Sequence, residues 1–552
     1  MQKSRASLAK TDVCTETDAE PPTPPRPARR WGTRAVASAL GILAAGIVGI
    51  ATTPPAPGVT GDSIYHLGGA ESLLISGRFE YPDARWRTVD TVQSMARTPP
   101  GLSIALAALR SVGASEMGAA RITQSVSAGV TVAVVVVLVA QLSGLVAGML
   151  TALTILALPA FYGIHVYVLT EPLFIAATVV ALWAVVSRRS ATLVGLALLA
   201  AAITRYVGVS VAVGAGLAAL FTTADWRARV LRGLTIAGPA VLFFAVWHQW
   251  TAQAKGGHPI EVRGLFPLGG ELAQAWQAIV TWLVPGSVTP LRVIQVAAMI
   301  GCALVVWFSR GDRAARNSRV PATEGEVERT RQSSRDFLVT VVSMLVCYAA
   351  FVVLAHVLAE PGIQFRERML FPTFVLAQVG AGALLITRIR TERWARYLGT
   401  VALAIWLGVS ARVSFARVEA EKRDGLEIES AALRASPTLG WLSENARGRM
   451  VFSNHPLAVY HHAKRPAKLW PARMLPDSTQ ALIARMSDRA LLVAFVRPDP
   501  WETIAPAEEV TSAVPLEIVA RLSDGTVYEL DPSRAEEYPV AAASSAIPTH
   551  PE

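Results

Sequence analysis

Residues 61–66, Gly-Asp-Ser-Ile-Tyr-His, follow closely on an apolar run at about 33–53. The run is long enough to cross a bilayer, which takes about 20 apolar residues. It is too long for the core of a signal peptide and lacks a small-residue cleavage site, so we interpret it as a retained membrane anchor. Asp62 therefore stands at the edge of the membrane, where an ionisable group is costly and indicates a function.

The composition is that of a polytopic membrane protein. Of the 552 residues, 52% are hydrophobic, and several further runs approach the length of a span. The net charge of +10 does not indicate nucleic-acid binding, because most arginines lie in short loops beside apolar runs, where they orient the chain. The three cysteines predict no disulfide framework.

Basic residues predict the orientation in the plasma (inner) membrane. Arginines between positions 26 and 34 place the N-terminal tail in the cytoplasm, so Asp62 is expected outside. The run at 99–112 is too short to span and opens with Pro-Pro-Gly, so we expect an interfacial or re-entrant helix. About eleven spans then place every strongly basic short loop inside. They are expected at about 33–53, 122–141, 143–160, 172–187, 191–204, 206–222, 233–250, 288–308, 336–357, 369–387 and 397–412.

The expected fold is an all-α polytopic membrane bundle with a small C-terminal α/β domain outside the membrane. The bundle covers 33–412 and has interfacial helices in a first outer loop at 54–121. Residues 1–32 and 533–552 are expected to be disordered tails. The domain at 413–532 is expected to contain strands at 449–452, 490–496 and 516–519 and helices at 436–444 and 456–462.

Asp62 is the first candidate for chemistry. It opens a predicted amphipathic helix at 63–76, whose Ile64, Leu67 and Leu74 are expected to dip into lipid. An aspartate at a helix start is also an ordinary N-cap, so spacing alone leaves capping and catalysis both open.

Two neighbours belong to the same predicted helix face. Tyr65 and His66 follow Asp62 at i+3 and i+4, so the three side chains share one side of the helix. We therefore count Tyr65 and His66 among the candidate substrate-binding residues.

A second acidic element, Tyr-Val-Leu-Thr-Glu-Pro at 167–172, opens a later span. The number of spans that precede each residue places both Glu171 and Asp62 outside. We therefore predict that the two acids belong to one site at the outer boundary of the membrane. An acid in a first helical turn before Pro172 is also favoured by the helix dipole, so a structural role stays open.

Three arginines lie on the predicted outer side. Arg205 stands between two short apolar runs, where an arginine can also snorkel without function. Arg366 and Arg368 depart from the positive-inside trend, so we expect anionic partners for them. Glu360 and Glu367 are one possibility, and a lipid phosphate is the other.

In this order the elements resemble the GT-C superfamily of membrane glycosyltransferases, which includes protein O-mannosyltransferases and bacterial lipid A aminoarabinose transferases. The shared features include the acid after the first span, the Pro-Pro element at 99–100 and the Tyr-x-Leu-x-acid-Pro element at 167–172. Residues 203–206 resemble the family's Leu-Thr-Arg/Lys element, and 365–372 resemble its Arg-Tyr-x-x-Pro element. The resemblance covers about 33–470.

The resemblance implies transfer of a sugar from a polyprenyl-phosphate donor to an acceptor hydroxyl outside the membrane. Asp62 would be the general base, and Glu171 would position the acceptor or help to hold a metal. Guanidinium groups suit a phosphate leaving group, and a hydroxyl nucleophile needs a carboxylate nearby. The resemblance assigns donor phosphate binding to Arg205 with Arg366 or Arg368, and Tyr65, His66 and Tyr167 are our candidates for the acceptor side.

A divalent metal is an open question. The family often has two adjacent acids in the first loop, whereas Ser63 follows Asp62 here. His66, His165 and Glu171 are weak ligand candidates, because they lack tight spacing. Three further histidines, at 455, 461 and 462, are interpreted as surface residues, because no cysteine or second ligand pair accompanies them.

Two other functions remain open: a transporter or flippase of lipid-linked glycans, and a non-catalytic protein of envelope assembly. Transporters usually show paired repeats with broken helices at the membrane midplane. Here the charged residues stand at the outer edge, which favours the enzyme.

Overall fold

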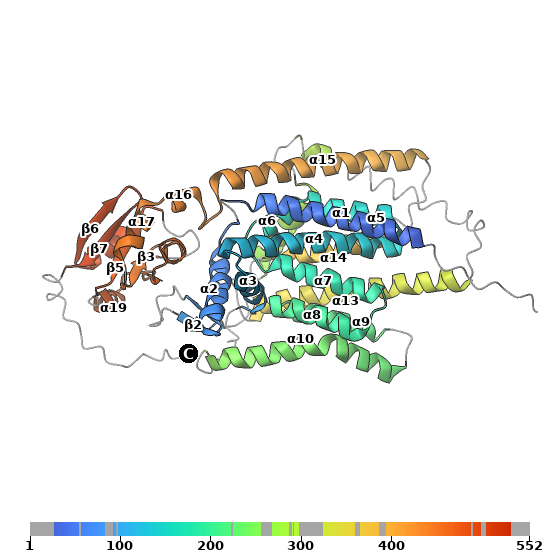
Figure 1. The fold of residues 1–552 in the computed structure, drawn as a ribbon, viewed down its shortest axis with the longest axis horizontal. Coiled ribbons are helices and arrows are strands. Elements are labelled where there is room, and N and C mark those ends of the chain that lie inside the picture. Colours follow the sequence, from blue (N-terminus) through green and yellow to red (C-terminus); the bar gives the residue numbers. More distant parts are fainter. Residues whose placement is uncertain are drawn as a thin grey trace, which may run out of the picture.

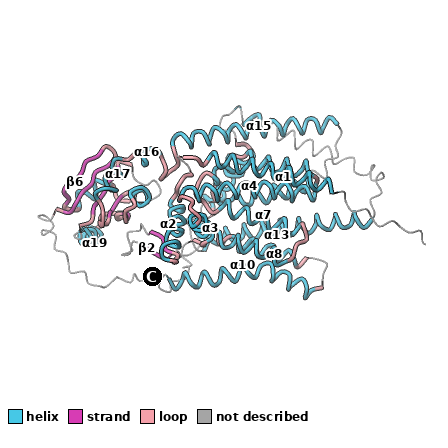
Figure 2. Tube along the Cα trace, viewed as in Figure 1, coloured by secondary structure: helices cyan, strands magenta, loops and turns pink. Residues whose placement is uncertain are grey.

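The computed structural model shows a mostly helical chain whose long helices run side by side, with a mixed sheet beyond one end of the bundle (Figures 1 and 2). It describes residues 27–54, 57–82, 92–94, 98–221, 225–254, 268–285, 290, 292–296, 324–358, 365–385, 393–486, 489–497 and 504–531. The predicted tail at 533–552, residues 1–26 of the other predicted tail and most of the predicted span at 288–308 lie outside these ranges.

The helices of the membrane part and its first loop are α1 (Pro27–Ala51), α2 (Gly61–Ser76), α3 (Gly101–Ser111), α4 (Glu116–Ser143), α5 (Leu145–Ala157), α6 (Pro159–His165), α7 (Glu171–Val186), α8 (Ala191–Thr204), α9 (Gly208–Ala219), α10 (Trp226–Ala254), α11 (Gly269–Leu283), α13 (Glu324–Leu358), α14 (Glu367–Leu385) and α15 (Arg393–Asp424). The strands β1 (Glu80–Pro82) and β2 (Val92–Ser94) pair antiparallel after α2. Helix α1 begins at Pro27, so the predicted disordered tail is wrong for 27–32.

The described residues contain five helices long and apolar enough to cross a membrane, so the chain is a multi-pass membrane protein. These helices are Trp31–Ala51, Glu116–Ser143, Trp226–Gln253, Ser334–Leu358 and Gly399–Asp424. Helices α5 and α6 together form a sixth candidate. Helices α3, α7, α8 and α9 are apolar but shorter, and the number of about eleven spans stays a prediction.

The span expected at 143–160 is not one straight helix. The chain breaks at Leu158, where α5 and α6 meet at 67°. Leu158 adopts an extended conformation, with ψ 135°, directly before Pro159. Proline disfavours a helical conformation in the residue before it, which accounts for the bend.

Small residues let the helices of the bundle approach closely. A Cβ atom added at Gly41 of α1 would lie 2.8 Å from the carbonyl oxygen of Gly129 in α4. One added at Gly214 of α9 would lie 2.6 Å from the carbonyl oxygen of Ser343 in α13. Close backbone contact of this kind is typical of helices packed in membranes, where dispersion replaces the hydrophobic effect.

The C-terminal segment forms a five-stranded sheet in the order β4-β3-β5-β7-β6. Strand β3 runs parallel to β4 and β5, while β7 runs antiparallel to β5 and β6. The elements are α16 (Ala431–Arg434), α17 (Pro437–Asn445), β3 (Val451–Ser453), α18 (Pro456–Ala458), the π-helix η2 (Val459–Ala463), β4 (Ala467–Leu469), α19 (Pro476–Met486), β5 (Leu491–Phe495), α20 (Ala507–Ala513), β6 (Leu516–Leu522) and β7 (Gly525–Leu530). The predicted strands overlap β3, β5 and β6, whereas β4 and β7 were not predicted.

Helix α2 lies across the end of the bundle, between the long helices and the sheet (Figure 1). Its Ile64 and Leu67 are 0% and 4% exposed and pack in one core with Leu102 of α3 and Leu457 of α18. The prediction that these two residues dip into lipid is therefore wrong, because protein covers them. Leu74 is 42% exposed.

Candidate active site

The first turn of α2 is capped without Asp62. Thr60 is the N-cap residue: its side chain accepts a hydrogen bond from the Ser63 amide, and the Ser63 hydroxyl accepts one from the Thr60 amide. This reciprocal capping box satisfies two backbone amides at the helix start, those of Thr60 and Ser63. Asp62 is not the N-cap, so its carboxylate is free for another partner.

Ser63 also joins α2 to the loop before α7. Its hydroxyl donates to the carbonyl oxygen of Val168 at 2.9 Å, and Gly58 and Tyr167 form a parallel bridge beside it. In the sequence, Ser63 was notable because it stands where the family often has a second acid. Here it holds the helix with Asp62 against the segment that leads to Glu171.

Gly58 marks the closest approach at this bridge. A Cβ atom there would lie 2.6 Å from Cβ of Leu426 and 2.6 Å from the ring of Tyr167. We expect Gly58→Ala to lower the free energy of unfolding by about 1–3 kcal/mol, because the bridge must move apart. Gly61→Ala is the matched control, since its added Cβ would meet only Leu457, at 3.4 Å. Thermal unfolding in detergent measures both, and equal stability of the two variants would contradict the expectation.

Four charged residues meet at the end of the bundle that carries α2. Arg368, in the first turn of α14, donates from Nη2 to Oδ2 of Asp62 at 2.8 Å and from Nε to Oε1 of Glu171. Arg205, directly after α8, forms an ion pair with the same oxygen of Glu171. Along this series of ion pairs, Asp62–Arg368–Glu171–Arg205, the side-chain charges alternate in sign and sum to zero.

Exposure changes along these four residues. The side chains of Glu171 and Arg205 are 0% and 12% exposed, whereas those of Arg368 and Asp62 are 37% and 44% exposed. A buried carboxylate needs charged partners, and Glu171 has two. At the exposed end of this series, the carboxylate of Asp62 and part of the Arg368 guanidinium group are therefore accessible from outside the protein.

The pKa of the Asp62 carboxyl is lowered from its usual 3.8. Burial alone would raise this pKa, but the charge of Arg368 and the hydrogen bond from it outweigh burial. Asp62 is therefore ionised at neutral pH.

No protein-family model matches the chain, and no curated protein matches it in sequence. Its fold resembles that of the arabinofuranosyltransferase AftD from Mycobacteria, with TM-score 0.50, 14% identity and coverage of 91% of this chain but only 41% of that chain. It also resembles the oligosaccharyltransferase of Archaeoglobus fulgidus tethered with an acceptor peptide, with TM-score 0.50 and 10% identity. That alignment covers 85% of this chain and 69% of the oligosaccharyltransferase chain. The chain has a GT-C-like fold. ArnT from Cupriavidus metallidurans, bound to undecaprenyl phosphate, aligns with 89% of this chain and 97% of that chain at 13% identity and TM-score 0.46.

The GT-C-like fold brings together four of the residues singled out in the sequence and leaves others apart. Arg366 is exposed and takes no part in the ion pairs of the four. Glu367 lies 3.8 Å from Arg417 and not at Arg368, whose partners are Asp62 and Glu171. Glu360 lies outside the described residues.

The three residues assigned to the acceptor side have different surroundings. His66 is buried, with Ser103 of α3 beside its ring, and burial lowers its pKa to about 4, so the ring is neutral at neutral pH. Tyr167 is half-buried at the Gly58 bridge, and burial raises its pKa to about 12. Tyr65 is half-buried on α2.

Two side chains that were not among the candidate site residues support the four charged residues. Thr170 accepts a hydrogen bond from Arg205 and donates one to Glu171, both at 3.3 Å. The buried Tyr348 of α13 donates to the carbonyl oxygen of Met369, next to Arg368. No sequence pattern singles out Thr170 or Tyr348, because the partners that give each its role lie far away in the sequence.

The weak metal candidates His66, His165 and Glu171 do not form a ligand group. Within the described ranges, the one group of three His, Cys, Asp or Glu side chains close enough to share an ion consists of Glu429, His461 and His462. The His165 ring is buried, with Nδ1 2.7 Å from the carbonyl oxygen of Phe161.

Proposed function

We propose that this protein is a membrane glycosyltransferase that moves a sugar from a polyprenyl-phosphate donor to an acceptor hydroxyl outside the membrane. The observation that carries the proposal is the alternating group Asp62–Arg368–Glu171–Arg205 at one end of a GT-C-like bundle. It offers a carboxylate for a hydroxyl proton and a guanidinium group for a phosphate at the same opening.

The proposed step is a single displacement. The acceptor oxygen attacks the anomeric carbon of the sugar, and its proton passes to the carboxylate of Asp62. The bond between the anomeric carbon and the phosphate oxygen breaks, and its electron pair leaves on polyprenyl phosphate. The attack comes from the face opposite the leaving group, so the anomeric configuration is inverted.

Arg368 links donor binding to the base. It now holds Asp62 at 2.8 Å and keeps the pKa of this carboxyl low, which makes it a weak base. A donor phosphate at the exposed side of Arg368 competes for the same N–H donors. As the guanidinium group turns toward phosphate, the pKa of Asp62 rises and the carboxylate becomes a better proton acceptor.

Glu171 and Arg205 have a different proposed role. Glu171 is fully buried and contacts both arginines, so it positions the two guanidinium groups and does not itself touch the acceptor. Arg205 adds a second positive charge behind Arg368, which stabilises the negative charge that develops on the departing phosphate.

Membranes that contain the protein, incubated with radiolabelled polyprenyl-phosphate sugars, test the proposal. We expect label to move from the organic-soluble donor to an acceptor fraction, and this transfer to depend on Asp62. Movement of the intact labelled donor across the vesicle membrane, without transfer of its sugar, would support a flippase instead.

The proposed orientation places the N-terminus in the cytoplasm and the C-terminal sheet outside. We expect a reporter fused after Arg189 to be cytoplasmic and one fused after Ala435 to be external, because the short basic loops stay inside. Alkaline phosphatase and fluorescent-protein fusions distinguish the two sides. A cytoplasmic signal after Ala435 would place the four charged residues on the wrong side for an external acceptor.

A further inference from the structure

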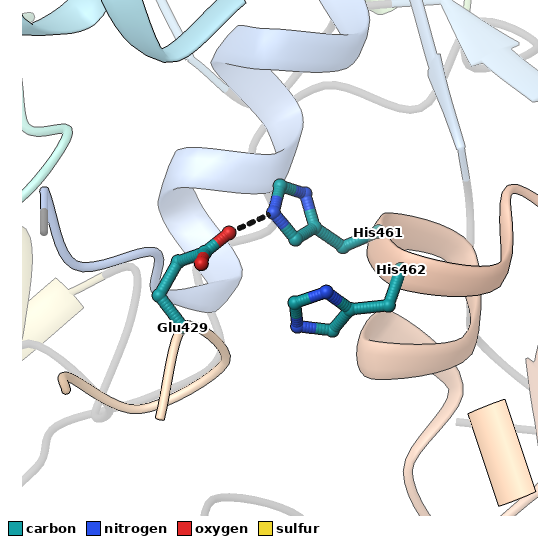
Figure 3. A group of neighbouring side chains, drawn as sticks. All are labelled: Glu429, His461 and His462. Carbon is teal, nitrogen blue, oxygen red and sulfur yellow. Dashed lines mark hydrogen bonds and ion pairs between the residues drawn. The ribbon is translucent and has the colours of Figure 1, made fainter. Parts of the chain in front are cut away.

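A second polar group lies where the C-terminal segment meets the membrane part. Glu429 follows α15, and His461 and His462 lie in the π-helix η2 (Figure 3). The sequence indicated surface histidines here, but His461 is 7% exposed and His462 is half-buried. The prediction of surface histidines is wrong for His461 and for His455, which is 6% exposed, because other segments of the protein cover them.

The π-helix brings two adjacent histidines to one side. Their ring centroids lie 4.9 Å apart. The ligand atoms of Glu429 and both rings lie within 4.8 Å of one another. Two imidazole nitrogens and one carboxylate form a ligand set that zinc prefers, with a fourth position for water.

Each ring has a second neighbour on the side of its other nitrogen. Nε2 of His462 donates to the carbonyl oxygen of Ile428 at 2.6 Å, which leaves Nδ1 as its ligand atom. Nε2 of His461 lies 2.5 Å from Glu429, and its Nδ1 lies 4.0 Å from the carboxylate of Glu116 at the start of α4. A histidine bound to metal almost always donates its other N–H to a carboxylate or a carbonyl. His462 makes such a hydrogen bond to Ile428, and Glu116 is the carboxylate on the Nδ1 side of His461, 4.0 Å away.

We propose that Glu429, His461 and His462 bind one divalent ion of the zinc class. The site is independent of the proposed glycosyl transfer. Arg434 lies 3.9 Å from Glu429 and Lys464 lies 3.6 Å from Glu116, so both cations compete with the ion for carboxylate charge.

The ion would tie the C-terminal segment to the start of α2. The amide of Ile428 donates to the carbonyl oxygen of Val59 at 3.2 Å, and Val59 directly precedes Thr60, the N-cap of α2. Glu116 comes from α4, so the group joins three parts of the chain.

Full-length protein, purified in detergent with a tag that contains no histidine, tests the site. After loading with zinc sulfate and dialysis against metal-free buffer, we expect about one zinc per chain by mass spectrometry of the metal, as the one ligand group in the described part of the chain predicts. Zinc should also raise the thermal unfolding midpoint of the wild type. Failure of the wild type to retain zinc would overturn the proposal without any variant.

Single variants then assign the ligands. His461→Gln, His462→Gln and Glu429→Gln should lose the zinc and the thermal shift. Glu116→Gln should weaken zinc binding by about 10–100-fold, as expected for a partner of a ligand. His455→Gln is the matched control, because His455 is a buried histidine of the same segment outside the group. Equal zinc retention by His462→Gln and His455→Gln would overturn the assignment, as adventitious binding elsewhere would then explain the metal.

Discussion

Replacing Asp62 by asparagine is expected to lower the rate of sugar transfer by about 10²–10⁴-fold, the usual contribution of a general base. Asparagine keeps the shape of aspartate, and its carboxamide oxygen can still accept the hydrogen bond from Arg368, but it cannot accept the acceptor's proton. The substitution leaves the capping box of Thr60 and Ser63 intact, so α2 should start as before. The measurement is the initial rate of transfer in membranes, beside donor binding.

The matched control is Glu71→Gln, an acid-to-amide change on the same helix and outside the four charged residues. It should transfer sugar at the wild-type rate. Asp62→Asn should bind the donor at least as tightly as the wild type does, because the arginines remain and a neutral asparagine competes less with phosphate for Arg368. Transfer by Asp62→Asn at the wild-type rate would show that Asp62 only pairs with Arg368.

The pH dependence of the wild type follows from the same contact. The pKa of Asp62 in the free protein is lowered from 3.8, so protonation should limit kcat/KM only below that pH. If phosphate draws Arg368 away, the acid limb of kcat should lie at higher pH than that of kcat/KM. As a group with a lowered folded-state pKa, Asp62 also contributes stability above its unfolded pKa and loses it as the pH falls through the folded value.

Glu171→Gln is expected to lower the free energy of unfolding by about 3–5 kcal/mol, the cost of removing one partner from a buried ion pair. Glu171 is 0% exposed and contacts both arginines, so its loss removes the carboxylate with which Arg205 pairs among the described residues. Donor binding should weaken as well, because the guanidinium groups lose their positioning. Thermal unfolding in detergent and donor retention on membranes measure the two effects.

The double variant Glu171→Gln with Arg205→Met separates charge from packing. It removes both partners of the most buried pair and leaves Arg368 with Asp62, so it should be more stable than Glu171→Gln alone. The account would be contradicted if the double variant lost as much free energy of unfolding as Glu171→Gln and Arg205→Met lose separately, added together. The two side chains would then contribute to stability independently.

The membrane class, the helical bundle and the charged candidates for the active site were all predictable from local patterns in the sequence. A spanning helix satisfies its own backbone hydrogen bonds and needs only a local apolar run, so these features are readable residue by residue. Asp62, Glu171, Arg205 and Arg368 stood out for a similarly local reason, since each is an ionisable group at the end of an apolar run.

How these residues pair depends on the tertiary fold. Arg368 holds an aspartate 306 positions away, and Thr60 rather than Asp62 caps α2. Protein rather than lipid covers Ile64, and Glu429, in the segment after α15, reaches His461. Such partners are chosen by packing between distant segments, and hydropathy and spacing along one stretch of chain carry no information about what will cover it.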